Sequence, residues 1–185
     1  FADEKYARVS RDGWVYFRWQ EGEIWRVRVD GSSLERAGVT DTLTGDTHPD
    51  PSPDGTRLVL ASSRFPEGIR LVIRDLASGA EQSLGVQGLL PRWSPSGDRI
   101  AYWSGDLFSQ RGAIYLIQPD GSGNQRLSPL GKEYRPEGLD WSPDGEWLVA
   151  RADTTLELIQ TSTGTALPLA YSRDHSWAAF RPQVP

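Results

Sequence analysis

The chain contains no cysteine, so disulfide bonds, thiolate zinc sites and cysteine nucleophiles are excluded. Lysine occurs only at positions 5 and 132, and histidine only at positions 48 and 175. The other positive charges are arginines, scattered through a chain whose formal net charge is -5. Because no lysine- and arginine-rich run is present, the electrostatic footprint of a nucleic-acid binder is missing. We therefore expect no nucleic-acid partner.

Long apolar runs and helical periodicity are also missing. No stretch repeats apolar residues at i, i+3, i+4 and i+7 without interruption by glycine or proline, which disfavours long helices. No run could cross a bilayer, and no signal peptide is visible. No Gly-x-Ser-x-Gly elbow occurs, and the glycine-rich stretches read as turns between strands rather than phosphate loops. The sequence predicts no membrane insertion, no cofactor and no catalytic activity.

Aromatic residues and turn formers are abundant instead. The chain carries 8 Trp, 6 Tyr and 5 Phe together with 19 Gly and 13 Pro. A hydrophobic content of 37% is enough for a folded core and argues against disorder. Since the glycines and prolines follow no collagen-like period, they indicate many turns.

One turn motif recurs at a regular spacing. It reads "SPDG" at Ser52 and Ser142, "SPSG" at Ser94 and "SRDG" at Ser10. These serines are separated by 42, 42 and 48 residues, a period typical of propeller blades. The Asp-Gly and Ser-Gly pairs suit tight hairpin turns, and β-branched or aromatic residues flank them.

Each period predicts four antiparallel strands. Such a meander cannot bury both faces alone, and radial stacking of several gives a β-propeller; a solenoid is the main competitor. We therefore expect an all-β fold, a single propeller domain over residues 1–185. The expected units are four full repeats and the start of a fifth, at 6–46, 47–87, 88–131, 132–170 and 171–182.

Two of the repeats, "PRWSPSGDRIAYWS" and "LDWSPDGEWLVARA", resemble the TolB-type, WD-repeat-like β-propeller repeat. The resemblance covers nearly the whole chain, with Pro51 in place of the usual Trp, Ser96 in place of Asp and no proline in the turn at Ser10. That family includes periplasmic TolB proteins and the propellers attached to prolyl-oligopeptidase-like and tricorn-type peptidases. The resemblance implies an extracytoplasmic setting, periplasmic, secreted or membrane-anchored.

The number of blades leaves the closure of the ring open. Most TolB-like propellers have six or more blades, whereas this chain supplies four full units. The ring could close with four blades, be an excised part of a longer propeller, or assemble from more than one chain. We favour a small closed ring, because open ends would expose an apolar blade face and unpaired strand edges. The oligomeric state is left open.

The repeated side chains themselves have structural explanations. The turn residues Asp12, Asp54 and Asp144 suggest calcium or catalysis, but an aspartate before glycine accepts backbone hydrogen bonds in the turn. Trp93 and Trp141 are expected to pack between blades. Other tryptophans, if exposed, could stack on sugars: Trp14, Trp19, Trp25 and Trp103.

We expect binding on the loop face, which carries the connections between blades and those between the second and third strands of a blade. The segments assigned to it are 46–50, 63–68, 88–92, 104–112, 133–140 and 172–175. The segment 104–112 is expected to hold most of the extra length of the third unit. Within it, Leu107 and Phe108 suit a partner anchor, unless Phe108 folds back over the blade.

The candidate partner-binding residues share this loop face. They are His48, Asp50, Phe65, Arg92, Leu107, Phe108, Arg111, Arg135, Glu137 and His175. Two histidines near Asp50 and Asp174 could form a metal or acid–base pair, but loop histidines are mostly solvated. We therefore predict no metal site.

Three functions follow, and the first is favoured. The chain is expected to be a non-enzymatic binding module for a protein or peptide. The alternatives are a gating or substrate-recruiting propeller of a larger peptidase, and a carbohydrate-binding propeller that uses exposed tryptophans.

Overall fold

A computed structural model describes residues 5–19, 22–37, 45–153 and 155–171 of the chain. The described residues form strands, turns and loops, arranged as four separate antiparallel sheets of four strands each. No helix in these ranges is long and apolar enough to span a membrane. The predicted all-β architecture of four-stranded blades is confirmed.

The four sheets follow one another in chain order, and we call them the first to fourth blades. The first contains β1 (Lys5–Val9), β2 (Trp14–Trp19), β3 (Glu23–Arg28) and β4 (Glu35–Arg36). The second contains β5 (Asp46–Pro51), β6 (Arg57–Ser62), β7 (Arg70–Asp75) and β8 (Glu81–Gln87). The third contains β9 (Leu89–Trp93), β10 (Ile100–Asp106), β11 (Arg111–Ile117) and β12 (Gln125–Arg126). The fourth contains β13 (Asp140–Trp141), β14 (Trp147–Ala152), β15 (Thr155–Gln160) and β16 (Ala166–Tyr171).

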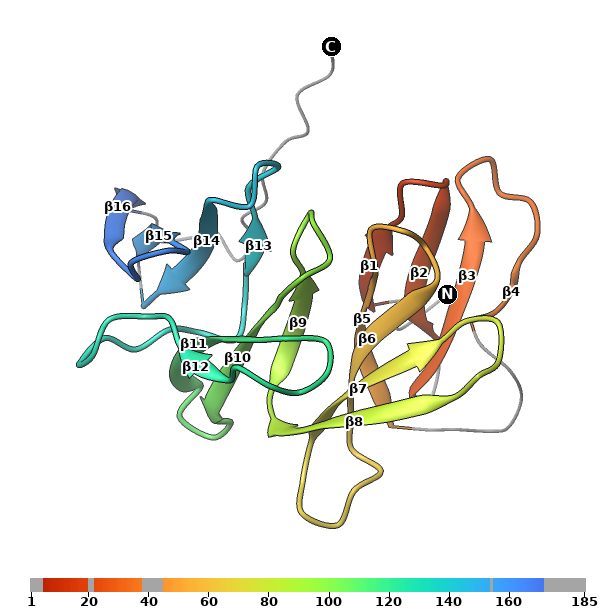
Figure 1. Cartoon of the computed structure of the whole chain (residues 1–185), viewed down its shortest axis with the longest axis horizontal. Helices are drawn as coiled ribbons and strands as arrows, with labels where there is room; N and C mark the ends of the chain where they lie inside the picture. The colour runs from red at the N-terminus through yellow and green to blue at the C-terminus, as the bar shows by residue number, and fades with distance from the viewer. Residues whose placement is uncertain (1–4, 20–21, 38–44, 154, 172–185) are drawn as a thin grey trace.

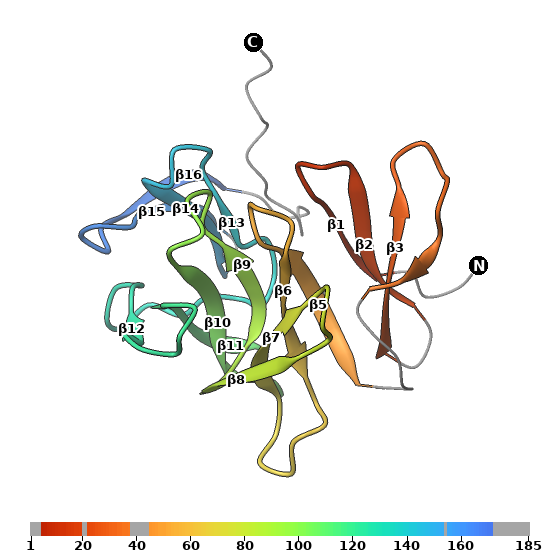
Figure 2. The same ribbon diagram turned by 45° about the vertical axis from the view of Figure 1, so that its right-hand side comes forward.

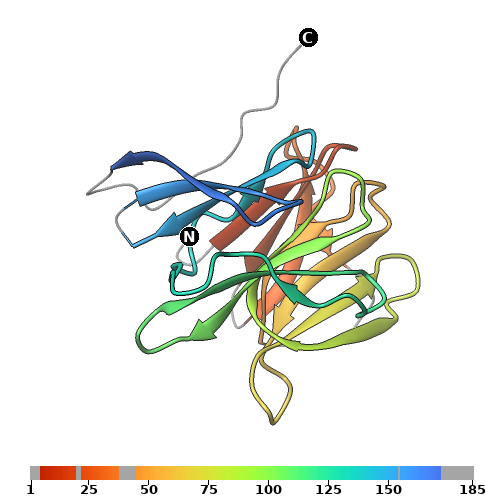
Figure 3. The ribbon, with the colours of Figure 1, turned by 60° about the vertical axis from the view of Figure 1, so that its left-hand side comes forward.

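The blades are arranged around a common centre. Figure 1 shows β1, β5, β9 and β13 toward the middle of the molecule, with β4, β8, β12 and β16 farther out. The first blade stands beside β5 of the second in Figure 2, and the fourth lies against the third in Figure 3. The turns β5–β6 and β9–β10 lie at the top of Figure 1 and the loop β6–β7 at the bottom. As predicted, the repeated turns lie opposite the loop face.

Apolar side chains fill the three interfaces between consecutive blades. Tyr16 of the first blade packs with Leu58 and Leu60 of the second in one cluster. A second cluster joins the second and third blades around Val59 and Tyr102. The third cluster joins the third and fourth blades. Because the second and third blades each contribute to two of these clusters, and the first and fourth to one, the hydrophobic core lies between the sheets.

The repeated tryptophans pack between blades, as expected. Trp93 and Trp141 are buried within the second and third clusters, and the indole N–H of Trp141 donates to the Arg92 carbonyl at 3.0 Å. Trp103 is fully buried and donates its indole N–H to the Tyr134 carbonyl at 2.7 Å, and Trp14 is buried as well. A sugar could not stack on Trp103 or Trp14, because neither indole face is open.

The turn aspartates are structural, as predicted, and the turn serines hydrogen-bond to them. Ser52 Oγ accepts from the Arg57 N–H at 3.0 Å and donates to Asp54 at 2.6 Å. Ser142 makes the equivalent bonds to the Trp147 N–H and to Asp144. In the third blade, where the motif carries Ser96, Asp98 takes the place of the missing aspartate and accepts from Ser94 at 2.8 Å.

Two sequence expectations about the loops were wrong. The segments 46–50 and 88–92 are inner strands rather than loops, since β5 and β9 cover nearly all of them. The extra length of the third unit is not in 104–112: only four residues separate β10 from β11. The long segment is the connection 127–139 between β12 and β13. Apolar residues of this connection, Tyr134 and Leu139, are buried in the cluster between the last two blades, so the insertion is part of the core.

The described contacts between the fourth blade and the first are polar. The Arg8 guanidinium lies 3.8 Å from the Asp140 carboxylate and 3.5 Å from the Leu139 carbonyl. Closure of the ring by packed blade faces stays a prediction. Of the expected fifth unit, 171–182, only residue 171 is among the described residues.

Candidate functional site

Each of the first three inner strands, and the segment just before β13, places one residue of unusual backbone conformation at the same position of the repeat. Tyr6, His48, Leu90 and Gly138 have φ values of 64°, 53°, 54° and 67°. They are spaced by 42, 42 and 48 residues, as the turn serines are. In β1, β5 and β9 the residue lies within a break in the strand register, a β-bulge. Bulges of this kind redirect a side chain out of the regular alternation of a strand.

These four positions surround one cavity of about 370 Å³ on the loop face, which we call the axial cavity. Leu89, Leu107 and Pro136 add apolar walls, and Gln110 and Glu137 add polar groups. The axial cavity is therefore mostly apolar with a few polar groups, as is usual for a ligand pocket.

His48 is the most unusual residue of the axial cavity. It is 6% exposed, its ring lies 3.8 Å from the ring of Tyr6, and its buried Nδ1 atom has no hydrogen-bond partner among the described residues. Burial, followed by the positive charges of Arg92, Arg18 and Arg8, lowers the pKa of His48 to about 3. The expectation of a solvated loop histidine was wrong, because His48 lies in β5. At neutral pH the ring is therefore uncharged.

A layer of alternating charge lies two residues further along each inner strand. Arg8, Asp50, Arg92 and Asp140 occupy equivalent positions of the four blades, again 42, 42 and 48 residues apart. Arg8 lies 3.4 Å from Asp50 and 3.8 Å from Asp140. Asp50 also accepts the Trp93 N–H at 2.8 Å. We call these four residues the charge quartet.

Burial is the largest influence on the pKa values of two members of the charge quartet, Arg92 and Asp50. It lowers the pKa of Arg92 to about 10, with Arg8 adding to the shift and the carboxylates of Asp50 and Asp140 opposing it. Burial likewise raises the pKa of Asp50, against the pull of Arg92, Arg8 and the Trp93 N–H. Because the two arginines alternate with two carboxylates, the quartet compensates its own charge and forms a polar floor beneath the axial cavity.

The β10–β11 loop stands beside the axial cavity. Leu107 lines the cavity while 49% of its surface stays exposed, and Phe108 is fully exposed. The Phe108 N–H donates to the Asp106 carboxylate at 2.9 Å, which fixes the loop. Of the two expectations for Phe108, exposure rather than folding back is found.

No known protein-family profile matches the chain. An uncharacterized protein of Agrobacterium fabrum (Atu1656) is 42% identical over 110 residues, covering 50% of this chain and 37% of that protein. TolB from Acinetobacter baumannii superposes with a TM-score of 0.72 at 19% identity, over 90% of this chain and 43% of TolB. A chain of the nidogen/laminin complex superposes with a TM-score of 0.75 at 14% identity, over 94% of this chain and 66% of that chain. The fold is that of a TolB-like β-propeller. The chain spans less than half the length of the relative and of TolB.

A second cavity of the TolB-like propeller, of about 610 Å³, lies between the third and fourth blades. The predicted residues Arg111 and Arg135 line it, together with residues of the connection 127–139. We call it the inter-blade cavity. Gln110 lines both this cavity and the axial cavity. The two cavities are therefore neighbours on the loop face.

The sequence-predicted residues separate into distinct places on the propeller. His48, Leu107 and Glu137 meet in the axial cavity, and Asp50 and Arg92 lie in the charge quartet. Phe65 packs against the cluster between the first two blades, and His175 lies outside the described residues.

The sequence interpretation missed several residues of the site. These are Tyr6, Arg8, Leu90, Gly138 and Asp140. The signal was present in the repeat: counting four and two residues back from each turn serine finds both layers. Among the described residues, no group of three or more His, Asp and Glu side chains is arranged to hold a metal ion.

Proposed function

We propose that this chain is a non-enzymatic binding module whose loop face receives a protein or peptide partner. The observation that carries the proposal is the axial cavity, whose walls are mostly apolar and include the buried ring of His48. An apolar side chain of a partner fits these walls. The β-propeller fold alone does not separate binders from enzymes.

The exposed Leu107–Phe108 pair also supports binding of a partner on the loop face. A fully exposed phenylalanine beside a cavity is typical of the aromatic anchors that dominate binding energy. The resemblance to the periplasmic TolB repeat supports a location outside the cytoplasm. A gating domain of a larger peptidase would present the same loop face, and an adjoining hydrolase segment in the gene would favour that alternative.

Selection of peptides from a random library tests the proposal. Phe108→Ala is expected to lower the affinity for the selected peptides about tenfold, as loss of a moderate hot spot does. His48→Asn is expected to lower it as well, because it changes a wall of the axial cavity. Arg11→Ala, an exposed change on the opposite turn face, is the matched control and should leave the affinity unchanged. Peptides that bind equally to all four proteins would contradict the proposal.

A carbohydrate remains the second candidate because two tryptophans of the first blade are only partly buried. Trp19 and Trp25 lie with ring centroids 5.9 Å apart, and the Trp25 N–H donates to Glu23 at 2.9 Å. Glycan-array binding that disappears in Trp19→Ala would support this candidate, and the absence of any glycan signal would remove it.

A further inference from the structure

The inter-blade cavity is built by the long connection between the third and fourth blades. Arg126 holds this connection in place by donating to the carbonyls of Ser128, Pro129 and Lys132 at 3.1, 3.1 and 3.0 Å. The connection also pairs with β11 through two hydrogen bonds between Gly112 and Tyr134. A Cβ on Gly112 would lie 2.4 Å from the Ser104 carbonyl oxygen of β10, so the close approach of β10 and β11 at this point requires a glycine. The walls of the cavity are therefore fixed before any ligand arrives.

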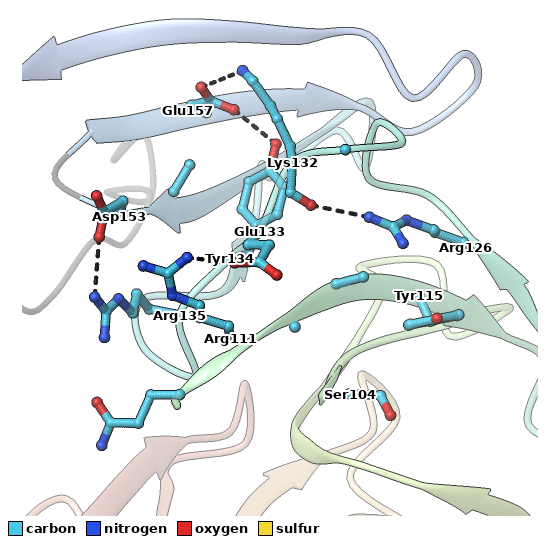
Figure 4. A pocket seen from close by; sticks show the side chains of 15 residues that line it. Ser104, Arg111, Tyr115, Arg126, Lys132, Glu133, Tyr134, Arg135, Asp153 and Glu157 are labelled. Atoms are coloured by element: carbon cyan, nitrogen blue, oxygen red, sulfur yellow. Dashed lines mark hydrogen bonds and ion pairs between the residues drawn. The ribbon is translucent and has the colours of Figure 1, made fainter. Parts of the chain in front are cut away.

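The floor of the inter-blade cavity contains a buried carboxylate whose partners are complete (Figure 4). Glu157 is 5% exposed, accepts from the Tyr134 hydroxyl at 2.7 Å and pairs with Lys132 at 2.6 Å. Burial and the charge of Glu157 raise the pKa of Tyr134, so its hydroxyl keeps the proton that it donates. Each oxygen of the Glu157 carboxylate therefore has a partner within the protein.

The rim carries arginines whose present partners are exposed. Arg111 pairs with Glu133 at 2.9 Å, and both side chains are more than half exposed. Arg135 pairs at 3.0 Å with Asp153, whose side chain is 70% exposed. Hydrogen bonding to Arg135, with added attraction from Arg111 and Arg151, lowers the pKa of Asp153. Exposed ion pairs contribute little to stability, so another carboxylate can replace Glu133 or Asp153.

The balance of charge in the inter-blade cavity favours an anion. Four cationic and three anionic side chains line it, although the whole chain is acidic. Arg126 has only carbonyl partners among its hydrogen bonds. Two rim positions, Gln110 and Asp153, have φ values of 53° and 50°, a strained conformation that is common at ligand clamps.

We propose that the inter-blade cavity binds a carboxylate on a short aliphatic stem, the side chain of a glutamate or aspartate of the peptide partner. Arg111 and Arg135 take the carboxylate through charge-assisted hydrogen bonds, and the small side chains of Ala113 and Ala152, which also line the cavity, leave room for the stem. The inference rests on the proposed function and adds to it. A partner segment that enters the axial cavity places an acidic side chain in the neighbouring cavity, past Gln110.

The test uses the amide of N-acetyl-L-glutamate, whose only charge is the side-chain carboxylate, and the amide of N-acetyl-L-glutamine as its neutral isostere. Titration is followed by the backbone amide signals of Gly112, Ala113 and Gly131 in the labelled protein. The glutamate probe should shift these signals saturably, with an affinity at least tenfold higher than that of the glutamine probe.

Two rim variants and one control complete the experiment. Arg111→Gln and Arg135→Gln should each lower the affinity for the glutamate probe about tenfold, while Arg11→Gln on the turn face should leave it unchanged. The dispersion of the amide signals verifies that all three variants fold. Equal affinity for both probes, or no loss in either rim variant, would overturn the inference. If the glutamate probe fails while selected peptides still depend on Phe108 and His48, the proposed function stands and the carboxylate site falls. If the glutamate probe binds but peptide affinity does not depend on Phe108 and His48, the carboxylate site stands and the proposed function falls.

Discussion

At the scale of single residues, the repeat explains which side chains the sequence could place. Trp93, Trp141 and the turn aspartates were predicted correctly, because their roles depend on local turn chemistry and on a repeated apolar position. His48 could not be placed in the same way. Its burial depends on a bulge in β5 and on Tyr6 of another blade, which no local pattern near residue 48 contains.

Trp141 gives a residue-scale test of the core. Trp141→Ala should destabilise the protein by about 3–5 kcal/mol, because the indole is buried between two blades and its N–H bond to Arg92 is lost. Urea unfolding measures the change. The partly buried Trp25 is the matched position, where alanine should cost less; a loss below about 1 kcal/mol for Trp141→Ala would be incompatible with its core position.

His48 gives a second residue-scale test, through pH. The pKa of His48 is about 3 in the folded protein against 6.5 for a free imidazole, so between these values only the unfolded chain takes up the proton. The stability contributed by neutral His48 is therefore complete above pH 6.5 and is lost as the pH falls toward 3. Between pH 7.5 and pH 5.0 the wild type should lose about 2 kcal/mol more than His48→Asn, measured by urea unfolding. Parallel losses in the two proteins would mean that His48 titrates normally.

At the scale of elements, the sequence predicted the blades but not the long connection. Four strands per period follow from the turn motif and the alternation of apolar residues, both of which are local. The place of the six extra residues in the third unit could not be predicted, since 104–112 and 127–139 both look like polar loops. What decides it is the burial of Tyr134 and Leu139 against the neighbouring blade, a contact between elements.

The repeated turn gives a test at this scale. Ser52→Ala should cost about 1–3 kcal/mol, because the Arg57 N–H loses its acceptor beside a buried serine. Ser78→Ala is the matched control: Ser78 also bonds to a turn aspartate, Asp75, but in an exposed turn, and should change stability by less than about 0.5 kcal/mol. Thermal or urea unfolding compares the two variants. Equal losses of stability would count against a special role of the β5–β6 turn.

At the scale of the whole molecule, the charge quartet links blades that are distant in the chain. Arg8 of the first blade reaches Asp50 of the second and Asp140 of the fourth, and Arg92 of the third donates to the Leu139 carbonyl at 3.2 Å. Apolar clusters join only consecutive blades among the described residues. The quartet is thus the described feature through which the first and fourth blades contact each other.

The coupling within the quartet can be measured. Arg92→Met should destabilise the protein by about 3–5 kcal/mol, because two carboxylates then face a single arginine in a buried site. Adding Asp50→Asn removes one carboxylate charge, so Arg8 and Asp140 again balance each other, and the amide oxygen can still accept the Trp93 N–H. The double variant should therefore recover at least half of the lost stability. The recovery appears as a coupling energy in a double-mutant cycle of urea unfolding free energies. Strict additivity of the two substitutions would mean that the alternation of charge around the centre is a consequence of the repeat and not a source of its stability.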